Sequence, residues 1–205
     1  MADKSVQIIL YRWAGAWGPF EIKIHCGECS LTHDVLQDTF RHELAGIPVN
    51  LQVKDWLSNW WQPLLKGGWH APIVQVEGKV ISQGQALNRG LLTEAVIDIH
   101  AGRSTLTGNH LFGKESCPHC KRAKSYLQDA GIDFTYHDVV QSPRAMYEML
   151  ARVKPIVGSK TPITVPQIWL NKNYVGGADQ LEAILHRKVE PNPDRGQCSL
   201  SPPGH

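Results

Sequence analysis

"GKESCPHCKRAK" occupies residues 113–124, and two residues separate its cysteines, Cys117 and Cys120. A CxxC pair at a helix start suits redox chemistry, because the unpaired N–H groups and the helix dipole stabilise a thiolate on the first cysteine. That thiolate attacks a disulfide, and the second cysteine resolves the mixed disulfide. Pro118 suits a first helical turn, Lys114 adds positive charge, and His119 does so when it is protonated. The stretch therefore predicts a dithiol centre rather than two buried core cysteines.

A second CxxC pair, Cys26 and Cys29, lies in "HCGECS" at residues 25–30. In a zinc ribbon the two CxxC halves are about 15–20 residues apart, whereas 87 residues lie between Cys29 and Cys117. We therefore expect no shared metal site. The pair is either a second redox centre or an idle one, and Glu28 between its cysteines raises thiol pKa values, which weakens the nucleophile.

The chain around each pair follows the same order of elements. In the first half we expect strands at 6–13 and 48–56, a helix from Leu31 to a stop at Gly46, paired strands within 72–82 and a helix over 86–99. In the second half we expect a strand at 110–112, a helix at 121–130, a strand at 132–136, a helix over 144–153 capped by Ser142, strands turning at Asn171–Lys172, and a helix over 178–187.

Spacing supports an internal repeat. Pro72 follows Cys26 by 46 residues, and Pro166 follows Cys117 by 49. The pattern predicts an α/β protein with two copies of one βαβ…ββα unit and a boundary near 101–108. We expect one domain at 1–103, a second at 106–190, and a disordered Pro/Gly/Ser-rich tail at 191–205 that carries Cys198 as a free thiol.

Three ordered motifs in the second half resemble the glutaredoxin family: K-x-x-C-P-x-C at 114–120, T-V-P at 164–166 and G-G-A-D at 176–179. The resemblance covers about residues 108–190. It implies a thioredoxin fold, a central mixed four-stranded sheet flanked by helices, with glutathione as the reducing co-substrate. The first half resembles a divergent thioredoxin-fold domain with Pro72 at the cis-proline position. Two tandem thioredoxin-fold domains are therefore expected.

The resemblance also implies roles for particular residues. Cys117 would be the nucleophile and Cys120 the resolving thiol, opposite a cis proline at Pro166. The backbone of Val165 would pair with the cysteinyl part of glutathione, and Lys114 with its glycine carboxylate. The remaining members of the implied glutathione site are His119, Thr164, Gly177, Ala178 and Asp179, of which the last two would hold the γ-glutamyl end.

The sequence departs from the family pattern at three places, one of which is "GSKTPI" at 158–163, which replaces a basic run often found before T-V-P. His119 stands where the family most often has tyrosine, which suggests a more oxidising dithiol. In the first half "HAP" at 70–72 and "SQGQ" at 82–85 replace the T-V-P and G-G-A-D motifs, so we expect no glutathione site there.

The predicted function is reduction of protein disulfides or glutathione mixed disulfides through Cys117 and Cys120. One alternative is a two-centre disulfide oxidoreductase that also uses Cys26 and Cys29. Another is a non-catalytic module that carries an iron–sulfur cluster or docks a partner, although Pro118 stands where cluster-binding members usually have glycine.

Composition narrows the partners. A formal charge of +2 with scattered basic residues does not favour nucleic acid, and no apolar run is long enough to suggest a membrane span or a signal peptide. We expect a cytoplasmic protein whose partners are glutathione and disulfide-containing or glutathionylated proteins. The tryptophans at 56, 60, 61 and 69 are interpreted as core or interface packing, with a docking groove as the alternative.

Overall fold

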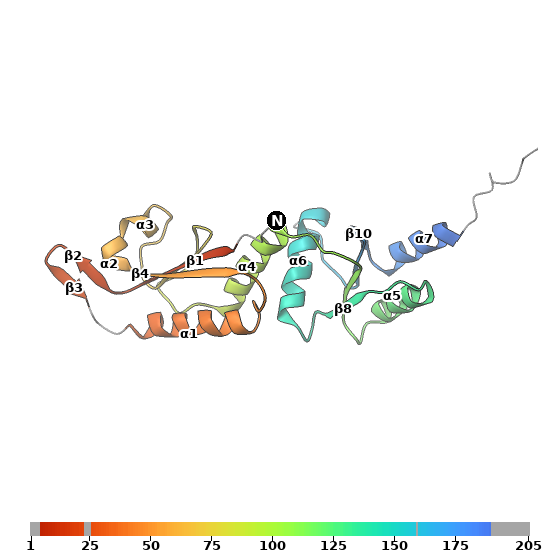
Figure 1. Ribbon diagram of the computed structural model, residues 1–205, viewed down its shortest axis with the longest axis horizontal. Helices are drawn as coiled ribbons and strands as arrows, with labels where there is room; N and C mark the ends of the chain where they lie inside the picture. The colour runs from red at the N-terminus through yellow and green to blue at the C-terminus, as the bar shows by residue number, and fades with distance from the viewer. Residues whose placement is uncertain (1–4, 23–25, 159, 190–205) are drawn as a thin grey trace, which may run out of the picture.

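The computed structural model describes residues 5–22, 26–158 and 160–189, with side chains up to residue 186, and contains two four-stranded sheets (Figure 1). The first sheet has the order β4-β1-β5-β6, in which β1 and β4 are parallel and β5 is antiparallel to both β1 and β6. Its elements, with the β2–β3 hairpin, are β1 (Val6–Arg12), β2 (Gly15–Trp17), β3 (Phe20–Ile22), α1 (Gly27–Arg41), β4 (Val49–Asp55), α2 (Trp56–Asn59), α3 (Trp61–Leu64), β5 (Ile73–Val76), β6 (Lys79–Gln83) and α4 (Arg89–Arg103).

The second sheet repeats this arrangement. Its order is β10-β9-β7-β8, with β7 and β8 parallel and β9 antiparallel to both of its neighbours. The elements are β7 (His110–Gly113), α5 (Pro118–Asp129), β8 (Thr135–Asp138), α6 (Pro143–Val157), β9 (Gln167–Leu170), β10 (Asn173–Gly176) and α7 (Ala178–Val189). The internal repeat is thus confirmed, and both halves have the mixed sheet and flanking helices of the thioredoxin fold.

Two turns confirm the predicted strand pairs. Glu77 and Gly78 join β5 to β6 with φ values of 49° and 79°, and Asn171 and Lys172 join β9 to β10 at 48° and 73°. Left-handed conformations at both central positions match the twist of a tight hairpin. The peptide bonds Ala71–Pro72 and Val165–Pro166 are cis.

Several predicted boundaries were wrong. Helix α1 ends at Arg41 rather than near Gly46, and Leu31 is 53% exposed because the buried face runs through Thr32 and Leu36. Helix α4 begins three residues later than expected, because the Asn88 side chain accepts a hydrogen bond from the Gly90 N–H at 2.8 Å.

Later elements differ at their ends as well. Strand β8 begins at Thr135, after the predicted start at Ile132. Helix α6 continues through Pro155 to Val157, beyond the predicted end at 153. The predicted Ser142 cap is confirmed, since its Oγ accepts from the N–H of Ala145 at 3.2 Å.

Each sheet packs its helices differently. In the first half α1 and α4 bury one core, with Leu36, Leu92 and Val96 fully enclosed. In the second half, consecutive residues of β7 point to opposite faces of the sheet and enter two different cores. Leu111 packs with α5 and α7, and Phe112 packs with α6. The second sheet is therefore covered on both faces by long helices.

The position that α6 occupies in the second half is taken in the first by α2 and α3, of four residues each. These short helices cover little surface, and Trp60, Trp61 and Trp69 are 41%, 53% and 63% exposed. The interpretation of these three as packing residues was therefore wrong. Trp56 does pack, stacking on Trp13 with ring centroids 5.1 Å apart.

Helices α4 and α6 lie against each other between the two sheets (Figure 1). Tyr147 of α6 packs against the first core, Lys154 pairs with Glu94 at 3.2 Å, and the Arg152 guanidinium donates to the Ser104 carbonyl at 3.0 Å. No helix among the described residues is long and apolar enough to cross a membrane. The predicted tail with Cys198 lies outside the described residues.

Candidate active site

Cys117 occupies the N-cap of α5, in extended backbone just before the first helical turn. Its N–H donates to the Lys114 carbonyl at 3.2 Å, which closes the loop between β7 and the helix. The thiol points across to the cis-proline segment and donates to the Val165 carbonyl at 3.8 Å. The predicted pairing of the dithiol loop with the proline loop is therefore present, and the Cys117 side chain is 7% exposed.

The two thiols of this pair have opposite pKa shifts. Burial acts to raise the pKa of Cys117, but the Cys120 N–H and thiol, the His119 N–H and the Lys114 charge outweigh burial and lower the pKa. Cys117 makes no capping hydrogen bond as a thiol, yet these amides lie close enough to favour the thiolate. Burial, and next the hydrogen bond with Cys117, raise the pKa of Cys120 to about 11.

Gly113 makes room for the buried Cys120. A Cβ atom at this position would lie 2.9 Å from Cys120 Sγ and 3.2 Å from a methyl carbon of Leu111. Sequence reasoning did not single out Gly113. The signal available was a glycine at the end of a strand, directly before the CxxC motif, where close approach of another group is a common reason for glycine.

A charged cluster that the sequence did not reveal adjoins Cys120. Lys124 Nζ pairs with Glu115 at 2.6 Å and lies 3.4 Å from the centroid of the Tyr136 ring. The Lys124 charge lowers the pKa of Cys120, as the weakest of the contributions to it. Burial and then the Glu115 carboxylate raise the pKa of Tyr136. These residues come from α5, β8 and the loop before α5, which only the folded chain brings together.

The proline loop and the start of α7 form the facing rim. The Thr164 carbonyl accepts from the Gln167 side-chain amide at 2.6 Å, which orders the loop before Val165. A Cβ on Gly177 would lie 3.8 Å from the Pro166 carbonyl oxygen, so the G-G-A-D segment adjoins the cis proline. The predicted residues of both motifs are thus neighbours.

Helix α7 begins at Ala178, as predicted. The Ala178 side chain is buried in the core, so only its backbone can face a ligand. The Asp179 carboxylate forms an ion pair with Arg122 of α5, which the sequence did not suggest. A ligand ammonium group would therefore share Asp179 with Arg122. Lys114 and His119 are exposed beside Cys117.

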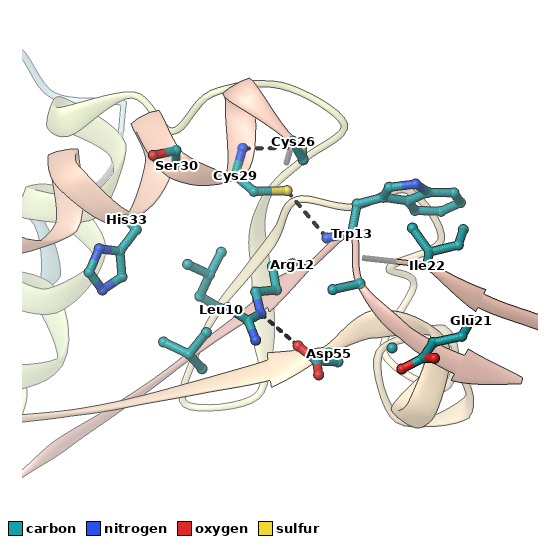
Figure 2. A pocket seen from close by; sticks show the side chains of 13 residues that line it. Leu10, Arg12, Trp13, Glu21, Ile22, Cys26, Cys29, Ser30, His33 and Asp55 are labelled. Carbon is teal, nitrogen blue, oxygen red and sulfur yellow. Dashed lines mark hydrogen bonds and ion pairs between the residues drawn. The ribbon is translucent and has the colours of Figure 1, made fainter. Parts of the chain in front are cut away.

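The first pair lies at the start of the helix that follows the first strand of its sheet, as Cys117 and Cys120 do in theirs; Figure 2 shows its surroundings. Cys26 is the N-cap of α1, and its sulfur accepts from the Cys29 N–H at 3.2 Å. The Cys26 thiol is 3.8 Å from the Glu28 carboxylate, and Cys29 Sγ accepts from the Trp13 N–H at 3.2 Å. Burial, and next the hydrogen bond with Cys26, raise the pKa of Cys29 to about 11, with Glu28 as the smallest contribution.

The two pairs stand on separate sheets, and all four thiols are free in this structure. The first pair lies at the start of α1 and the second at the start of α5, and α4 and α6 lie between these two helices (Figure 1). Within residues 5–22, 26–158 and 160–189, no group of three or more His, Cys, Asp or Glu side chains is placed to hold a metal ion.

Known proteins resemble the second half. The glutaredoxin family model matches residues 110–175. A glutaredoxin of Pseudomonas aeruginosa is 41% identical over 68 residues, which are 33% of this chain and 73% of that protein. Glutaredoxin 3 of Escherichia coli K12 is 34% identical over 74 residues, which are 36% of this chain and 81% of that protein.

Two solved structures were also compared with the chain. The solution structure of glutaredoxin from Brucella melitensis matches with 28% identity and a TM-score of 0.32, covering 41% of this chain and 84% of that one. A buckwheat glutaredoxin–glutathione complex matches with 19% identity and a TM-score of 0.38, covering 50% and 86%. From the motifs, the geometry around Cys117 and the matched relatives together, this chain belongs to the glutaredoxin family of thiol–disulfide oxidoreductases through its second half.

Proposed function

We propose that Cys117 and Cys120 carry out glutathione-linked reduction of protein disulfides and glutathione mixed disulfides. The observation that carries this proposal is that the pKa values of the two thiols are shifted in opposite directions. The pKa of Cys117 is lowered at a helix N-terminus, and the pKa of the enclosed Cys120 is raised to about 11. The first thiol is thereby prepared to attack, and the second stays protonated until it is needed.

In the proposed reaction with a glutathionylated protein, the Cys117 thiolate attacks the glutathione sulfur. The protein thiolate leaves and takes a proton from solvent, and Cys117 is left in a mixed disulfide with glutathione. A second glutathione thiolate then attacks the glutathione sulfur of that disulfide, which releases oxidised glutathione and restores the Cys117 thiolate. Each turnover thus consumes one free glutathione, which leaves joined by a disulfide to the glutathione that the substrate carried.

With a protein disulfide, the resolving step falls to Cys120. Cys117 attacks one substrate sulfur and the other leaves as a thiolate. Cys120 then loses its proton and attacks Cys117 Sγ, which releases the second substrate thiol and forms the Cys117–Cys120 disulfide. Two glutathione molecules reduce it. The enclosed position of Cys120, within one helical turn of Cys117, supports this order of steps.

The proposed glutathione site uses the rim around Cys117. Val165 would offer backbone hydrogen bonds to the cysteinyl group, and Lys114 its ammonium to the glycine carboxylate. The N–H groups at the start of α7 suit the γ-glutamyl carboxylate. Thr164, Pro166 and Gly177 would shape the groove, with His119 at its edge. We expect the reaction in a reducing compartment such as the cytoplasm, with the two halves as separate domains that divide at 103–106.

Serine variants of the full chain test the proposal in an assay of glutathione-dependent mixed-disulfide reduction. We expect Cys117→Ser to reduce activity to background. Cys120→Ser should keep the reduction of glutathione mixed disulfides and lose that of protein disulfides, and Cys26→Ser should match the wild type.

Two outcomes would contradict the proposal. Equal losses in Cys117→Ser and Cys26→Ser would favour a two-centre oxidoreductase. An inactive wild type that gains a visible chromophore on anaerobic reconstitution with iron and sulfide would favour a cluster carrier.

A further inference from the structure

A cavity of about 720 Å³ opens beside the first CxxC pair (Figure 2). Both Cys26 and Cys29 line it, at the first turn of α1. Its other walls come from the end of β1, the β2–β3 hairpin and the end of β4, which contribute Trp13, Ile22 and Asp55 among others. Ligand pockets in proteins span about 300–1,000 Å³, so the space suits one disulfide and the residues next to it.

The β2–β3 hairpin that walls this cavity has no counterpart before Cys117. Residues 13–25 separate β1 from Cys26, whereas residues 114–116 alone separate β7 from Cys117. The first half therefore carries an insertion directly before its dithiol. Because the insertion forms a cavity wall, it is placed to contact whatever reacts with the thiols.

Contacts with α2 fix the hairpin in place. The Ala16 N–H donates to Ser58 Oγ at 3.0 Å, and the Leu57 N–H donates to the Ala14 carbonyl at 3.0 Å. Gly15 has a φ of +108°, and a Cβ there would lie 2.6 Å from Ser58 Oγ. A side chain at this position would push the hairpin off α2, so the wall depends on glycine.

The charged side chain that contacts Cys26 is acidic, because the Glu28 carboxylate lies 3.8 Å from the Cys26 sulfur. Arg12, the one guanidinium that lines the cavity among the described residues, is paired with Asp55 at 2.6 Å, so these two charges offset each other. The Glu28 carboxylate opposes a ligand with surplus negative charge, such as glutathione with its two carboxylates and one ammonium.

Cys117 has the opposite surroundings. Lys114 lowers the pKa of its thiol, and Lys121 follows the CxxC motif on the first turn of α5. The nearby Glu115 is paired with Lys124. The charged side chains beside the two dithiols thus have opposite signs, Glu28 beside Cys26 and Lys114 beside Cys117, and charges of opposite sign favour differently charged substrates.

Large apolar side chains are exposed on the same half of the molecule. Trp17 and Phe20, at the tip of the hairpin that walls the cavity, are 60% and 67% exposed. Exposed aromatic residues of this kind are typical of surfaces that bind polypeptides. Charge and apolar surface therefore point to the same class of substrate.

We propose that Cys26 and Cys29 form a second thiol–disulfide exchange site, whose substrate is a disulfide in a neutral or basic polypeptide segment rather than glutathione. The segment lies along the aromatic hairpin and places its disulfide in the cavity, where the Glu28 carboxylate favours its positive charge. This site acts independently of Cys117.

The exchange balances within the pair. The Cys26 thiolate attacks one substrate sulfur, the substrate S–S bond breaks, and the other sulfur leaves as a thiolate that takes a proton from solvent. Cys29 loses its proton and attacks Cys26 Sγ, which releases the second substrate thiol and forms the Cys26–Cys29 disulfide. The substrate gains two electrons and two protons. For further turnovers, a dithiol reductant reduces the Cys26–Cys29 disulfide and returns two electrons and two protons to the pair.

The test uses the full chain with Cys117, Cys120 and Cys198 changed to serine, so that only Cys26 and Cys29 remain. Single-turnover reduction is measured for two disulfide-linked peptides that contain the same aromatic residue and differ only in flanking lysine or glutamate, and for oxidised glutathione. We expect the lysine peptide to react about three to ten times faster than the other two at low salt, a factor typical of a few partly exposed charges. The ratio of the lysine-peptide rate to the glutamate-peptide rate should fall in 0.5 M salt, because this concentration of salt screens the charges.

Further variants on this background locate the effect. Cys29→Ser should trap the lysine peptide as a mixed disulfide on Cys26, detected by intact mass. Glu28→Gln should narrow the peptide ratio, whereas Asp133→Asn, the same charge change on an exposed residue of the second half, should leave it unchanged. Gly15→Ala should slow the peptide reaction through the displaced hairpin while alkylation of Cys26 by iodoacetamide continues.

Three results would overturn the proposal. They are the absence of any exchange above that of a free dithiol, a preference for oxidised glutathione, and equal rates for the two peptides at low salt. If Gly15→Ala proves misfolded by circular dichroism, the Glu28→Gln and Asp133→Asn pair still decides the matter. Since the variant used in these tests lacks Cys117, these outcomes are separate from any failure of the glutathione reaction proposed above.

Discussion

At the scale of single residues, small differences around similar cysteines give the two pairs different characters. Both first cysteines occupy the N-cap position of a helix, and burial is the main cause that raises the pKa of both second cysteines to about 11. The neighbours differ: the Cys26 thiol donates a hydrogen bond to the Glu28 carboxylate, and the Lys114 charge favours the thiolate of Cys117. The charged residue beside the first cysteine thus differs in sign between the two pairs.

The close fit of Gly113 against Cys120 leads to a prediction. In Gly113→Ala the new methyl group would lie 2.9 Å from Cys120 Sγ, so the resolving thiol must shift. We expect a loss of about 1–3 kcal/mol in the free energy of unfolding, typical of an overpacked core. The displaced thiol should also resolve the mixed disulfide on Cys117 more slowly, which stopped-flow kinetics with a protein disulfide would measure.

Gly102→Ala is the matched control, because nothing lies within 4 Å of a Cβ at this position of α4. Alanine has the higher helix propensity, so this variant should be as stable as the wild type or more stable by up to about 1 kcal/mol. Normal resolution kinetics in Gly113→Ala would show that the space beside Cys120 has no part in the reaction.

At the scale of elements, β7 and β8 are joined by an unusual side-chain cluster. His137 pairs in register with Phe112, and their rings stack at 4.4 Å. His137 Nε2 also lies 3.0 Å from His110 Nδ1, two residues away from Phe112 on the same face of β7. Two imidazoles this close share one hydrogen bond when both are neutral, and they repel when both are charged.

This cluster predicts a pH dependence of stability. Burial, and next the His110 ring, lower the pKa of His137 from its ordinary value of 6.5. Below pH 6.5 the unfolded chain binds a proton that the folded chain does not, so the free energy of unfolding should fall as the pH drops from 6.5 through the folded-state pKa. Urea unfolding at pH 7.5 and 5.5 would measure this loss.

His137→Phe keeps an aromatic ring beside Phe112 and removes the titrating group, so its stability should fall less between these pH values. His186→Phe, on the exposed face of α7, serves as the control and should keep the wild-type slope. A slope in His137→Phe equal to that of the wild type would assign the pH dependence to other groups.

At the scale of the whole molecule, the two halves meet through α4 and α6. Tyr147 reaches from α6 into the first core, and a Cβ on Gly90 would lie 3.0 Å from its hydroxyl. Glycine at position 90 therefore permits the close approach of the two helices. A contact of this kind couples the unfolding of the two halves.

Tyr147→Ala tests that coupling. Six of the seven tryptophans lie before residue 70, so tryptophan fluorescence reports mainly on the first half, while the reactivity of Cys120 with a thiol reagent reports on the second. The two unfolding transitions should coincide in the wild type and separate in Tyr147→Ala. The free energy of unfolding should fall by about 1–2 kcal/mol, which is less than the 3–5 kcal/mol lost when a fully buried aromatic residue is changed to alanine.

Val140→Ala is the control, because this side chain is 65% exposed. Coincident transitions in both variants would mean that the halves are coupled through other contacts, such as the pair of Lys154 and Glu94.

The amino-acid pattern was enough to predict the repeat, the order of strands and helices and the position of each CxxC pair. These features depend on periodicity, turn residues and spacing, which are local properties of the chain. It also placed Asn171 and Lys172 in a turn and Ser142 at a helix cap, both confirmed. Boundaries were less accurate where a cap such as Asn88 or a later tertiary contact decided the end of a helix.

The surroundings of each thiol, in contrast, depend on how the chain folds. The closeness of Gly113 to Cys120, the pairing of Arg122 with Asp179 and the cavity beside Cys26 all join residues from separate elements. No local pattern encodes such contacts, because they depend on how the sheet brings distant segments to one edge. Short α2 and α3 likewise left aromatic residues exposed that the sequence alone had suggested were buried.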